Sequence, residues 1–333
     1  MNRILLVGLG PLGQFVANDA ARRGVARVVA AVDIDARLTG KPVSEIVPEC
    51  GFAAPVHRSM DDVANWGEID CAVVTTSSDL AACADTFRDL LARGVSIVST
   101  CEELLFPWLR HKALAQELHD LAVEHGARLM GTGVNPGFMM DALPVAATAV
   151  CRRVRAVKCW RIQDATTRRI PFQKKIGATL DDAAFDARVK DGSLRHVGLG
   201  ESLHFISHYL GLGVVKWEET LSAVKAEKDM SCGLGPIRKG CAAGVRQTAH
   251  GWNAAGEEVV TMEFQAAIGQ PHPHDRVVIE GEPRIDLRIE GGVHGDIATS
   301  AITLNAIDSL LAAAPGLHTM ATVPVVHCTA AMR

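Results

Sequence analysis

Three glycines, Gly8, Gly10 and Gly13, form a G-x-G-x-x-G pattern whose surroundings constrain the fold more than any other feature of the chain. The residues before it, "RILLVG" (3–8), are almost continuously apolar, as expected for a strand of a parallel sheet that is covered on both faces. The residues after it, "PLGQFVANDAARRG", have the periodicity of an amphipathic helix that stops at Gly24. This order predicts the first strand and helix of a doubly wound sheet.

The same alternation of strands and helices continues through the first part of the chain. Later strand-like segments are residues 25–33, 70–76, 95–100 and 127–132, and the amphipathic segments between them close with glycine. We therefore expect an α/β domain over residues 1–145, a Rossmann-type doubly wound parallel sheet. Residues 295–333 should return to this domain, because the segment 295–316 is an apolar helix long enough to pack on it.

A second domain is expected over residues 146–294, where the pattern changes. A chain of 333 residues is long enough for two cores. Alternating, strand-like stretches at 154–164, 243–253, 257–269, 274–282 and 284–292 are separated by Gly, Asn and Pro. They predict an α+β domain with a mostly antiparallel sheet, with helices such as 201–211 on one face. Its expected role is substrate binding or dimerisation.

The glycine pattern also predicts a dinucleotide cofactor. Gly8 permits the tight turn, Gly10 lets backbone amides approach a pyrophosphate, and Gly13 lets helix and strand pack closely, with Pro11 and Leu12 completing the turn. The helix N-terminus adds positive potential for the phosphates. The alternative is a structural glycine turn in a domain that binds no cofactor.

An acid twenty residues after the last glycine favours NAD. Asp33 ends the second strand, where a carboxylate would bind the ribose hydroxyls and repel a 2′-phosphate. Arg37 and Lys41 follow closely, so NADP is the alternative cofactor.

The ends of later strands should line the nicotinamide site, because ligands bind at the carboxyl ends of such strands. Small polar residues stand there, and each is a candidate for cofactor contact: Thr75, Thr76, Ser77, Thr100 and Cys101. For the first three, capping of the following helix is an equally good interpretation.

Two adjacent glutamates, Glu102 and Glu103, follow the fifth strand. Ser99 and Thr100 stand three residues before them, so both pairs fit the capping-box pattern. Capping needs only one glutamate, and a carboxylate near an apolar nicotinamide face could exchange protons with an amine. We expect at least one of the two to be catalytic.

The segment "GTGVNPGFMMDALP" (131–144) ends the sixth strand with many turn-forming residues. Asn135 and Pro136 predict an extended residue followed by a turn. Asn135 is a candidate for cofactor or substrate contact, and Pro136, Phe138, Met139 and Met140 for the wall of an apolar substrate pocket. A hinge between domains would use the same residues.

Five ordered segments together resemble the 2,4-diaminopentanoate dehydrogenase and native amine dehydrogenase family, distant relatives of dihydrodipicolinate reductase. They are "STCEEL", "GTGVNPGFMMDALP", "PFQKKIG", "RHVGLGESL" and "EGGVHGDIATSAITLNAI", and the resemblance spans nearly the whole chain. It implies a homodimer and NAD(P)-dependent, reversible deamination of an amine to a ketone and ammonia. The family's catalytic glutamate falls within Glu102–Glu103, and we favour Glu102 because it is nearer the strand end.

The same segments suggest further substrate residues, each with a structural alternative. His196 could reach the substrate together with Glu201, although a buried hydrogen bond at a helix start is the favoured interpretation of the pair. Thr299, in the C-terminal helix, could face the pocket or only the domain interface.

Other partners are disfavoured by composition. The formal charge of −4 offers no basic surface for nucleic acid or acidic membranes. No apolar run approaches the roughly 18 residues of a membrane span. The nine scattered cysteines contain no C-x-x-C pair, which argues against a metal site and for a cytoplasmic protein.

Two other functions stay open at this point. One is another two-domain NAD(P) reductase, related to dihydrodipicolinate reductase or homoserine dehydrogenase. The first would need a basic, histidine-rich motif for its dianionic substrate, and the second a lysine in the cleft where "STCEEL" offers acids. The other is a catalytically silent NAD-binding sensor.

Overall fold

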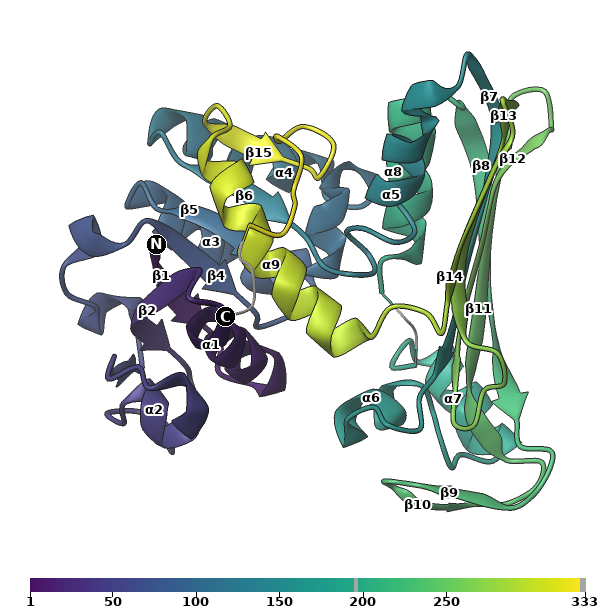
Figure 1. Cartoon of the computed structure of the whole chain (residues 1–333), viewed down its shortest axis with the longest axis horizontal. Coiled ribbons are helices and arrows are strands. Elements are labelled where there is room, and N and C mark those ends of the chain that lie inside the picture. Colours follow the sequence, from purple (N-terminus) through teal and green to yellow (C-terminus); the bar gives the residue numbers. More distant parts are fainter. Residues whose placement is uncertain (195–196, 330–333) are drawn as a thin grey trace. The chain divides into compact units, whose positions relative to one another are not determined.

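The computed structural model describes residues 1–194 and 197–329. The chain forms two compact units, one of Met1–Phe138 with His294–Arg333 and the other of Met139–Val293 (Figure 1). The first junction lies a few residues before the boundary expected after residue 145, because the short helix α5 (Ala142–Ala147) belongs to the second unit.

The first unit contains a seven-stranded parallel sheet in the order β15-β6-β5-β4-β1-β2-β3. Its strands are β1 (Asn2–Val7), β2 (Ala26–Val32), β3 (Val56–His57), β4 (Cys71–Val74), β5 (Ser96–Ser99), β6 (Arg128–Gly131) and β15 (Gly316–His318). The predicted doubly wound topology is confirmed. The strand β15, which pairs with β6 after the C-terminal helix, was not predicted.

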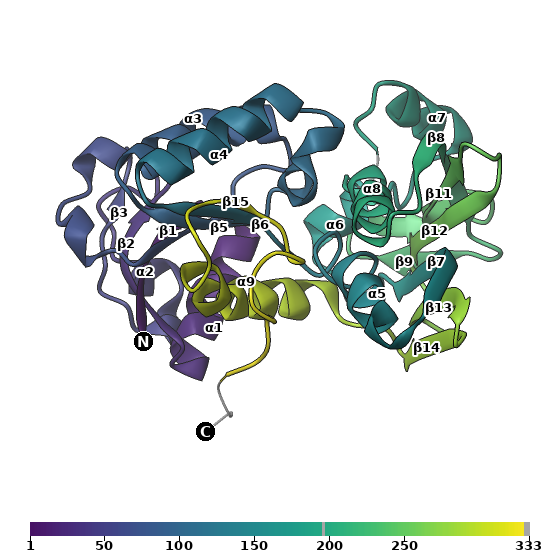
Figure 2. The same ribbon diagram turned by 90° about the horizontal axis from the view of Figure 1, so that it is seen from above.

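Helices cover both faces of this sheet. In Figure 2, α3 (Leu80–Ala92) and α4 (Lys112–Glu124) lie on one face, and α1 (Pro11–Arg23) and α9 (Gly295–Leu311) lie together on the other. The short pieces of this unit are α2 (Val43–Ile46) and the 3₁₀ turns η1 (Pro48–Cys50), η2 (Met60–Asp62), η3 (Trp66–Glu68), η4 (Glu102–Leu105) and η5 (Pro107–Leu109).

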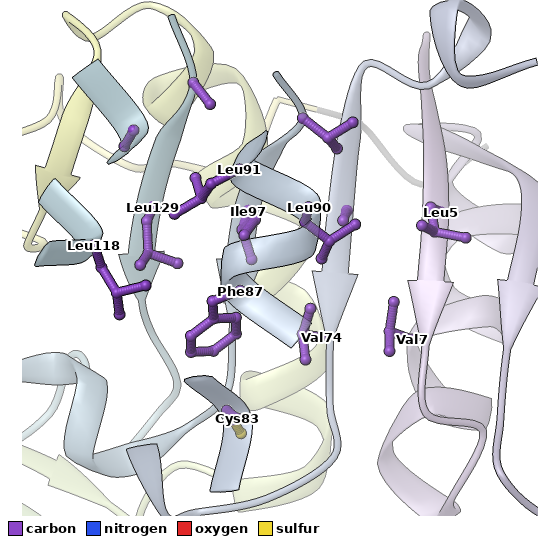
Figure 3. Close-up of a cluster of buried hydrophobic side chains, with 14 of the residues drawn as sticks. Leu5, Val7, Val74, Cys83, Phe87, Leu90, Leu91, Ile97, Leu118 and Leu129 are labelled. Atoms are coloured by element: carbon purple, nitrogen blue, oxygen red, sulfur yellow. The ribbon is translucent and has the colours of Figure 1, made fainter. Parts of the chain in front are cut away.

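This two-sided cover explains why the strands are apolar throughout. Along β1, Leu5 and Val7 enter the cluster under α3, which Figure 3 shows around Phe87. Ile4 and Leu6, pointing to the opposite side, enter the cluster under α1 and α9.

The second unit contains a six-stranded sheet in the order β14-β13-β7-β12-β11-β8. The strands are β7 (Arg153–Asp164), β8 (Val214–Lys225), β11 (Ala242–Asn253), β12 (Glu258–Ala267), β13 (His274–Glu282) and β14 (Ile285–Glu290). Only β12 and β7 pair in parallel, so the prediction of a mostly antiparallel sheet is confirmed. A hairpin of β9 (Met230–Cys232) and β10 (Gly235–Ile237) is separate from it.

Helices of the second unit leave one face of its sheet open. The helices are α5, α6 (Ile170–Lys175), α7 (Asp182–Lys190) and α8 (Leu199–Leu210), with the 3₁₀ turn η6 (Thr148–Val150) after α5. Both views place α5 and α8 on the same face (Figures 1 and 2). Along β11, Val245 and Ala249 are buried, whereas Arg246 on the other face is exposed, as the alternation requires.

A buried ion pair joins two strands of the second unit to the unit's last residue. Arg161 on β7 and Asp275 on β13 are each 2% exposed, and two bonds of 2.7 and 2.9 Å join the guanidinium to the carboxylate. The backbone of Val293, the last residue of the unit, donates to Asp275 and accepts from Arg161. The pair therefore fixes the point where the chain leaves the sheet.

Among the described residues, no helix has the length and apolar character needed to cross a membrane.

Candidate active site

The candidate residues of the first unit follow strands that are neighbours in the sheet. β6, β5, β4, β1 and β2 stand side by side and are parallel, so the loops after them meet at one edge. Backbone hydrogen bonds tie these loops to the adjoining strand ends: Thr75 to Val7, Thr100 to Val74 and Thr132 to Ser99. The structure thus brings the predicted cofactor residues and the glutamate pair to the same edge.

The glycine turn has the close packing that the motif requires. Gly8 has a φ of 91°, in the left-handed region. A Cβ on Gly13 would lie 2.0 Å from the Gly8 carbonyl oxygen, which itself accepts a hydrogen bond of 2.9 Å from the Thr75 hydroxyl. Around Gly10, by contrast, a Cβ would meet nothing within 4 Å.

The start of α1 suits a phosphate. The helix begins at Pro11, and its N-cap, Gly10, makes no side-chain capping bond. The first amides of a helix attract anions, and open space beside Gly10 gives a pyrophosphate access to them. The residues present therefore fit a dinucleotide.

Alanine at the two glycines should have different effects. We expect Gly13→Ala to destabilise the protein by about 1–3 kcal/mol, because its Cβ would collide with backbone. Gly10→Ala should stay within about 0.5 kcal/mol of the wild type but weaken NAD binding, because its methyl group would enter the space proposed for the pyrophosphate. Urea unfolding and NADH titration separate the two effects. Equal stability losses would contradict the packing assignment.

Asp33 is held by the glycine loop. One carboxylate oxygen accepts the Leu9 amide at 2.6 Å, and the other accepts the Asp35 amide at 2.8 Å. The loop thus places an acid directly beside the glycine turn. Arg37, the residue that could favour NADP, is paired with Asp35, and hydrogen bonds from Arg37 lower the pKa of Asp35 to about 2.

Two substitutions at Asp33 can separate its charge from its contact with the loop. Asp33→Asn keeps an oxygen for the Leu9 amide but removes the charge that repels a 2′-phosphate. We expect it to shift the ratio of kcat/KM values from NAD towards NADP, with a smaller loss of stability than Asp33→Ala because only the acceptor for the Asp35 amide is lost. Asp33→Ala should shift the same ratio and also lose about 1 kcal/mol of stability. If Asp33→Asn lost NAD and NADP activity equally, its assignment to cofactor choice would fail.

The loop after β4 is partly structural. The Ser77 hydroxyl accepts the Asp79 amide, and Asp79 caps α3 by accepting the Ala82 amide. The Thr75 hydroxyl donates to the Gly8 carbonyl, and the Thr76 hydroxyl lies 3.6 Å from the Cys83 sulfur. Helix capping is therefore carried by Asp79, with Ser77 supporting it.

The predicted capping box of Ser99 and Glu102 does not form after β5. The Ser99 hydroxyl donates to the Val74 carbonyl and accepts the Cys101 amide, and η4 starts without a side-chain cap. Because the Ser99 hydroxyl bonds to the end of the neighbouring strand, it does not cap the turn that contains the glutamates.

The two glutamates differ in burial. Glu103 is buried, and its Oε2 atom accepts the amide of Leu80, the first residue of α3, at 3.0 Å. The same oxygen lies 3.0 Å from the Nε2 atom of His111. Glu103 therefore stabilises the N-terminus of a neighbouring helix. Glu102 is partly exposed at the start of η4, directly after the strand-end residues Thr100 and Cys101.

The turn after β6 folds tightly on itself and meets the C-terminal helix. A Cβ on Gly137, at φ 131°, would lie 2.3 Å from the Gly133 nitrogen. The peptide bond between Asn135 and Pro136 is cis. The Val134 amide donates to the hydroxyl of Thr299 on α9 at 3.4 Å. Asn135, Pro136 and Thr299 are thus near one another within the first unit.

The remaining candidates are spread over the chain. Phe138 ends the first unit, whereas Met139 and Met140 begin the second and are buried. His196 lies outside the described residues. Among the residues that are described, no cluster of three or more His, Cys, Asp or Glu side chains could hold a metal ion.

The contacts of Glu103 were not predicted. His111 lies eight residues later in the chain and Leu80 twenty-three residues earlier, and no sequence motif connects them. Only the meeting of the β4 and β5 loops at one edge could have suggested that an acid after β5 reaches the start of α3.

Comparison with known proteins gives a consistent set of relatives. Residues 138–333 match the family model described as 2,4-diaminopentanoate dehydrogenase C-terminal domain. The chain is 27% identical over 337 residues to the 2,4-diaminopentanoate dehydrogenase of Acetoanaerobium sticklandii, covering 97% of this chain and 93% of that protein. It is 25% identical over 272 residues to an amine dehydrogenase of Streptomyces virginiae, covering 73% of each.

Among solved structures, the amine dehydrogenase from Mycobacterium smegmatis has a similar fold. Its TM-score is 0.84 at 22% identity, and the match covers 98% of this chain and 97% of the other. This similarity shows that the two chains share both the parallel and the mixed sheet.

Proposed function

Because the chain belongs to the 2,4-diaminopentanoate dehydrogenase family, we propose that it is an NAD(P)-dependent amine dehydrogenase that converts an amine and water reversibly to a ketone and ammonia. The observation that carries the proposal is the position of Glu102, which directly follows the strand-end residues Thr100 and Cys101. Glu102 is partly exposed at the edge of the sheet that also carries the candidate cofactor residues. The adjacent Glu103 is buried and contacts the Leu80 amide and His111.

The cofactor is assigned to the glycine turn and its neighbours. Gly8, Gly10 and Gly13, with Pro11 and Leu12, would hold the pyrophosphate at the start of α1, and Asp33 the adenosine ribose. The following residues would surround the nicotinamide: Thr75, Thr76, Ser77, Thr100, Cys101 and Asn135. When bound, the nicotinamide ring accepts or supplies the hydride. NAD is the preferred cofactor and NADP the alternative.

Glu102 is proposed to move protons at the substrate nitrogen and oxygen. In the amination direction its carboxylate takes a proton from ammonium, and the resulting ammonia adds to the ketone carbon. The protonated Glu102 then gives that proton to the departing hydroxyl of the carbinolamine, which leaves as water and produces the iminium carbon. In deamination the same group works in reverse order.

Residues near the turn after β6 are proposed to bind the substrate. Asn135 and Thr299 would offer polar contacts, with Pro136, Phe138, Met139 and Met140 as apolar ones; His196 remains a candidate from the sequence. Apolar contacts would limit competing reactions with water at the iminium carbon. A 2,4-diaminopentanoate-like compound or a simple amine is the proposed substrate class.

The oligomer is proposed to be a homodimer in the cytoplasm. The open face of the second sheet carries Trp160 and Trp252 among cross-strand pairs of opposite charge, such as Arg246 with Glu263 and Arg276 with Asp286. A charge-balanced face with aromatic residues can pair with its own copy about a two-fold axis. Light scattering should therefore give twice the chain mass of 35.5 kDa, and a single-chain mass would contradict the proposal.

The direct test of the activity is ketone- and ammonium-dependent oxidation of NADH. We expect NADH absorbance to fall only when a ketone and an ammonium salt are both present, and mass spectrometry to detect the amine. Consumption of NADH with the ketone alone would indicate a ketone reductase. Tight NADH binding without turnover in either direction would indicate a silent sensor.

A further inference from the structure

Two cysteine thiols meet beneath the loop that follows β4. Cys83 lies in the first turn of α3, and Cys101 directly follows β5; each is 1% exposed. Their sulfurs lie 3.7 and 3.3 Å from the carbonyl oxygens of Ser77 and Ser78, two successive residues of the loop. Both sulfurs therefore lie against the same short stretch of backbone. Figure 3 shows Cys83 at one end of the apolar cluster.

The residues beside these thiols reach the protein surface. Thr76 is exposed, Ser77 and Ser78 are partly exposed, and the Thr76 hydroxyl lies 3.6 Å from the Cys83 sulfur. Exposed and partly exposed residues of one surface loop therefore lie directly beside the sulfurs, although each cysteine is itself buried.

The two sulfurs differ in acidity. The hydrogen bond from Cys101, helped by the Thr76 hydroxyl and the Ser77 backbone, lowers the pKa of Cys83 to about 7. The same pairing, together with burial, raises the pKa of Cys101. For comparison, Cys71 is buried in the same unit, and burial is the main reason that its pKa is raised to about 12. One member of the pair thus becomes a thiolate near neutral pH and the other keeps its proton, which suits stepwise oxidation.

We propose that Cys83 and Cys101 are an oxidation site that forms a reversible disulfide with hydrogen peroxide. The Cys83 thiolate attacks one peroxide oxygen, the O–O bond breaks, and hydroxide leaves, giving a sulfenic acid. The Cys101 sulfur then attacks the Cys83 sulfur and the S–O bond breaks. The Cys101 proton converts one hydroxide to water, and the proton that Cys83 released to solvent on becoming a thiolate converts the other. Overall, two thiols and one peroxide give one disulfide and two waters. A dithiol reductant reverses the step by thiol–disulfide exchange.

The disulfide would disturb the proposed catalytic turn. Cys101 immediately precedes Glu102, and the Glu103 amide donates to Ser78 in the same loop. A disulfide holds its sulfurs at about 2.05 Å, closer than any hydrogen-bonded pair, so the end of β5 and the start of α3 must move together. Misplacement of a reacting group by about 1 Å can cost on the order of a hundredfold in rate. This effect on turnover rests on the proposed function, whereas disulfide formation does not.

The test is peroxide treatment of the full-length protein followed by peptide mapping. After alkylation of the remaining thiols and digestion with trypsin, residues 59–88 should be found linked to residues 94–110, and fragment ions should assign the bond to Cys83 rather than Cys71. Turnover should fall by about tenfold or more and recover after addition of dithiothreitol.

Cys83→Ala is the matched variant, because it removes one sulfur and adds no polar group to the apolar cluster. It should retain wild-type basal turnover and keep it after peroxide treatment, whereas Cys71→Ala should remain sensitive. Cys101→Ala should abolish the linked peptides. Absence of the Cys83–Cys101 linkage in the wild type would overturn the proposal. A complete linkage that leaves turnover unchanged would confirm the disulfide and overturn its effect on the proposed catalytic turn.

Discussion

Replacing Glu102 by glutamine is expected to lower turnover in both directions by roughly 10²- to 10⁴-fold, while NADH binding stays nearly unchanged. The amide has almost the same shape as the carboxylate, but it can neither take a proton from ammonium nor return one to the departing hydroxyl. Steady-state kinetics with an amine and with a ketone plus ammonium measure the loss, and fluorescence titration with NADH measures binding.

Glu103→Gln is the matched control, because the same substitution is made one residue further along the chain. Glutamine can still accept a hydrogen bond from the Leu80 amide or from His111, so the expected cost is about 1 kcal/mol of stability. Turnover should stay within a few-fold of wild type. If instead Glu103→Gln removed turnover and Glu102→Gln kept it, the catalytic residue would be Glu103. If both stayed active, the proton-transfer mechanism would be wrong.

Replacing Arg161 by leucine should give the largest loss of stability, about 3–5 kcal/mol. The substitution would leave the Asp275 carboxylate buried without its cationic partner and would remove the donor to the Val293 carbonyl. Burial disfavours the charged form of Arg161 and lowers its pKa, so the pair depends on its mutual contact rather than on solvent. Urea unfolding followed by tryptophan fluorescence measures the change.

A double substitution separates the ion pair from simple packing. If an unpaired buried charge is the cause, Arg161→Leu with Asp275→Leu should be considerably more stable than Arg161→Leu alone, since both charges are then removed. Two results would contradict this account of the pair. One is a loss below about 1 kcal/mol for Arg161→Leu, and the other is a double variant whose loss of stability equals the sum of the two single losses.

Much of the first unit was predictable because its signals are local. The strand before Gly8, the helix after it and Asp33 at the end of β2 each follow from short-range periodicity and glycine stereochemistry. Once the strands are known to be parallel neighbours, the loops after β4, β5 and β6 must meet at one edge. The composition of the candidate site follows from that topology.

What escaped prediction depends on contacts between distant residues. The capping-box pattern at Ser99 failed because its hydroxyl bonds the neighbouring strand, a contact made by residues twenty-five positions apart. Likewise, the contacts of Glu103 with Leu80 and His111 join residues that are twenty-three and eight positions apart. The Cys83–Cys101 pair has no spacing motif at all.

The strands β3, β8, β9, β10 and β15 were not predicted, and for β8 and β15 the reason is a different one. β8 lies at the edge of its sheet and most of its residues are exposed or half-buried, so its apolar alternation is weak. β15 is only three residues long, which is too short for periodicity to be detected after a long apolar helix.

The measurement that tests the central claim most directly compares amines with alcohols of the same carbon skeleton as electron donors. Each pair is incubated with NAD or NADP at alkaline pH, and the absorbance of the reduced cofactor and the release of ammonia are followed together. We predict that at least one amine is oxidised with one ammonia released per reduced cofactor, and that its matching alcohol is not. Oxidation of the alcohols with no reaction of the amines would contradict the proposed function.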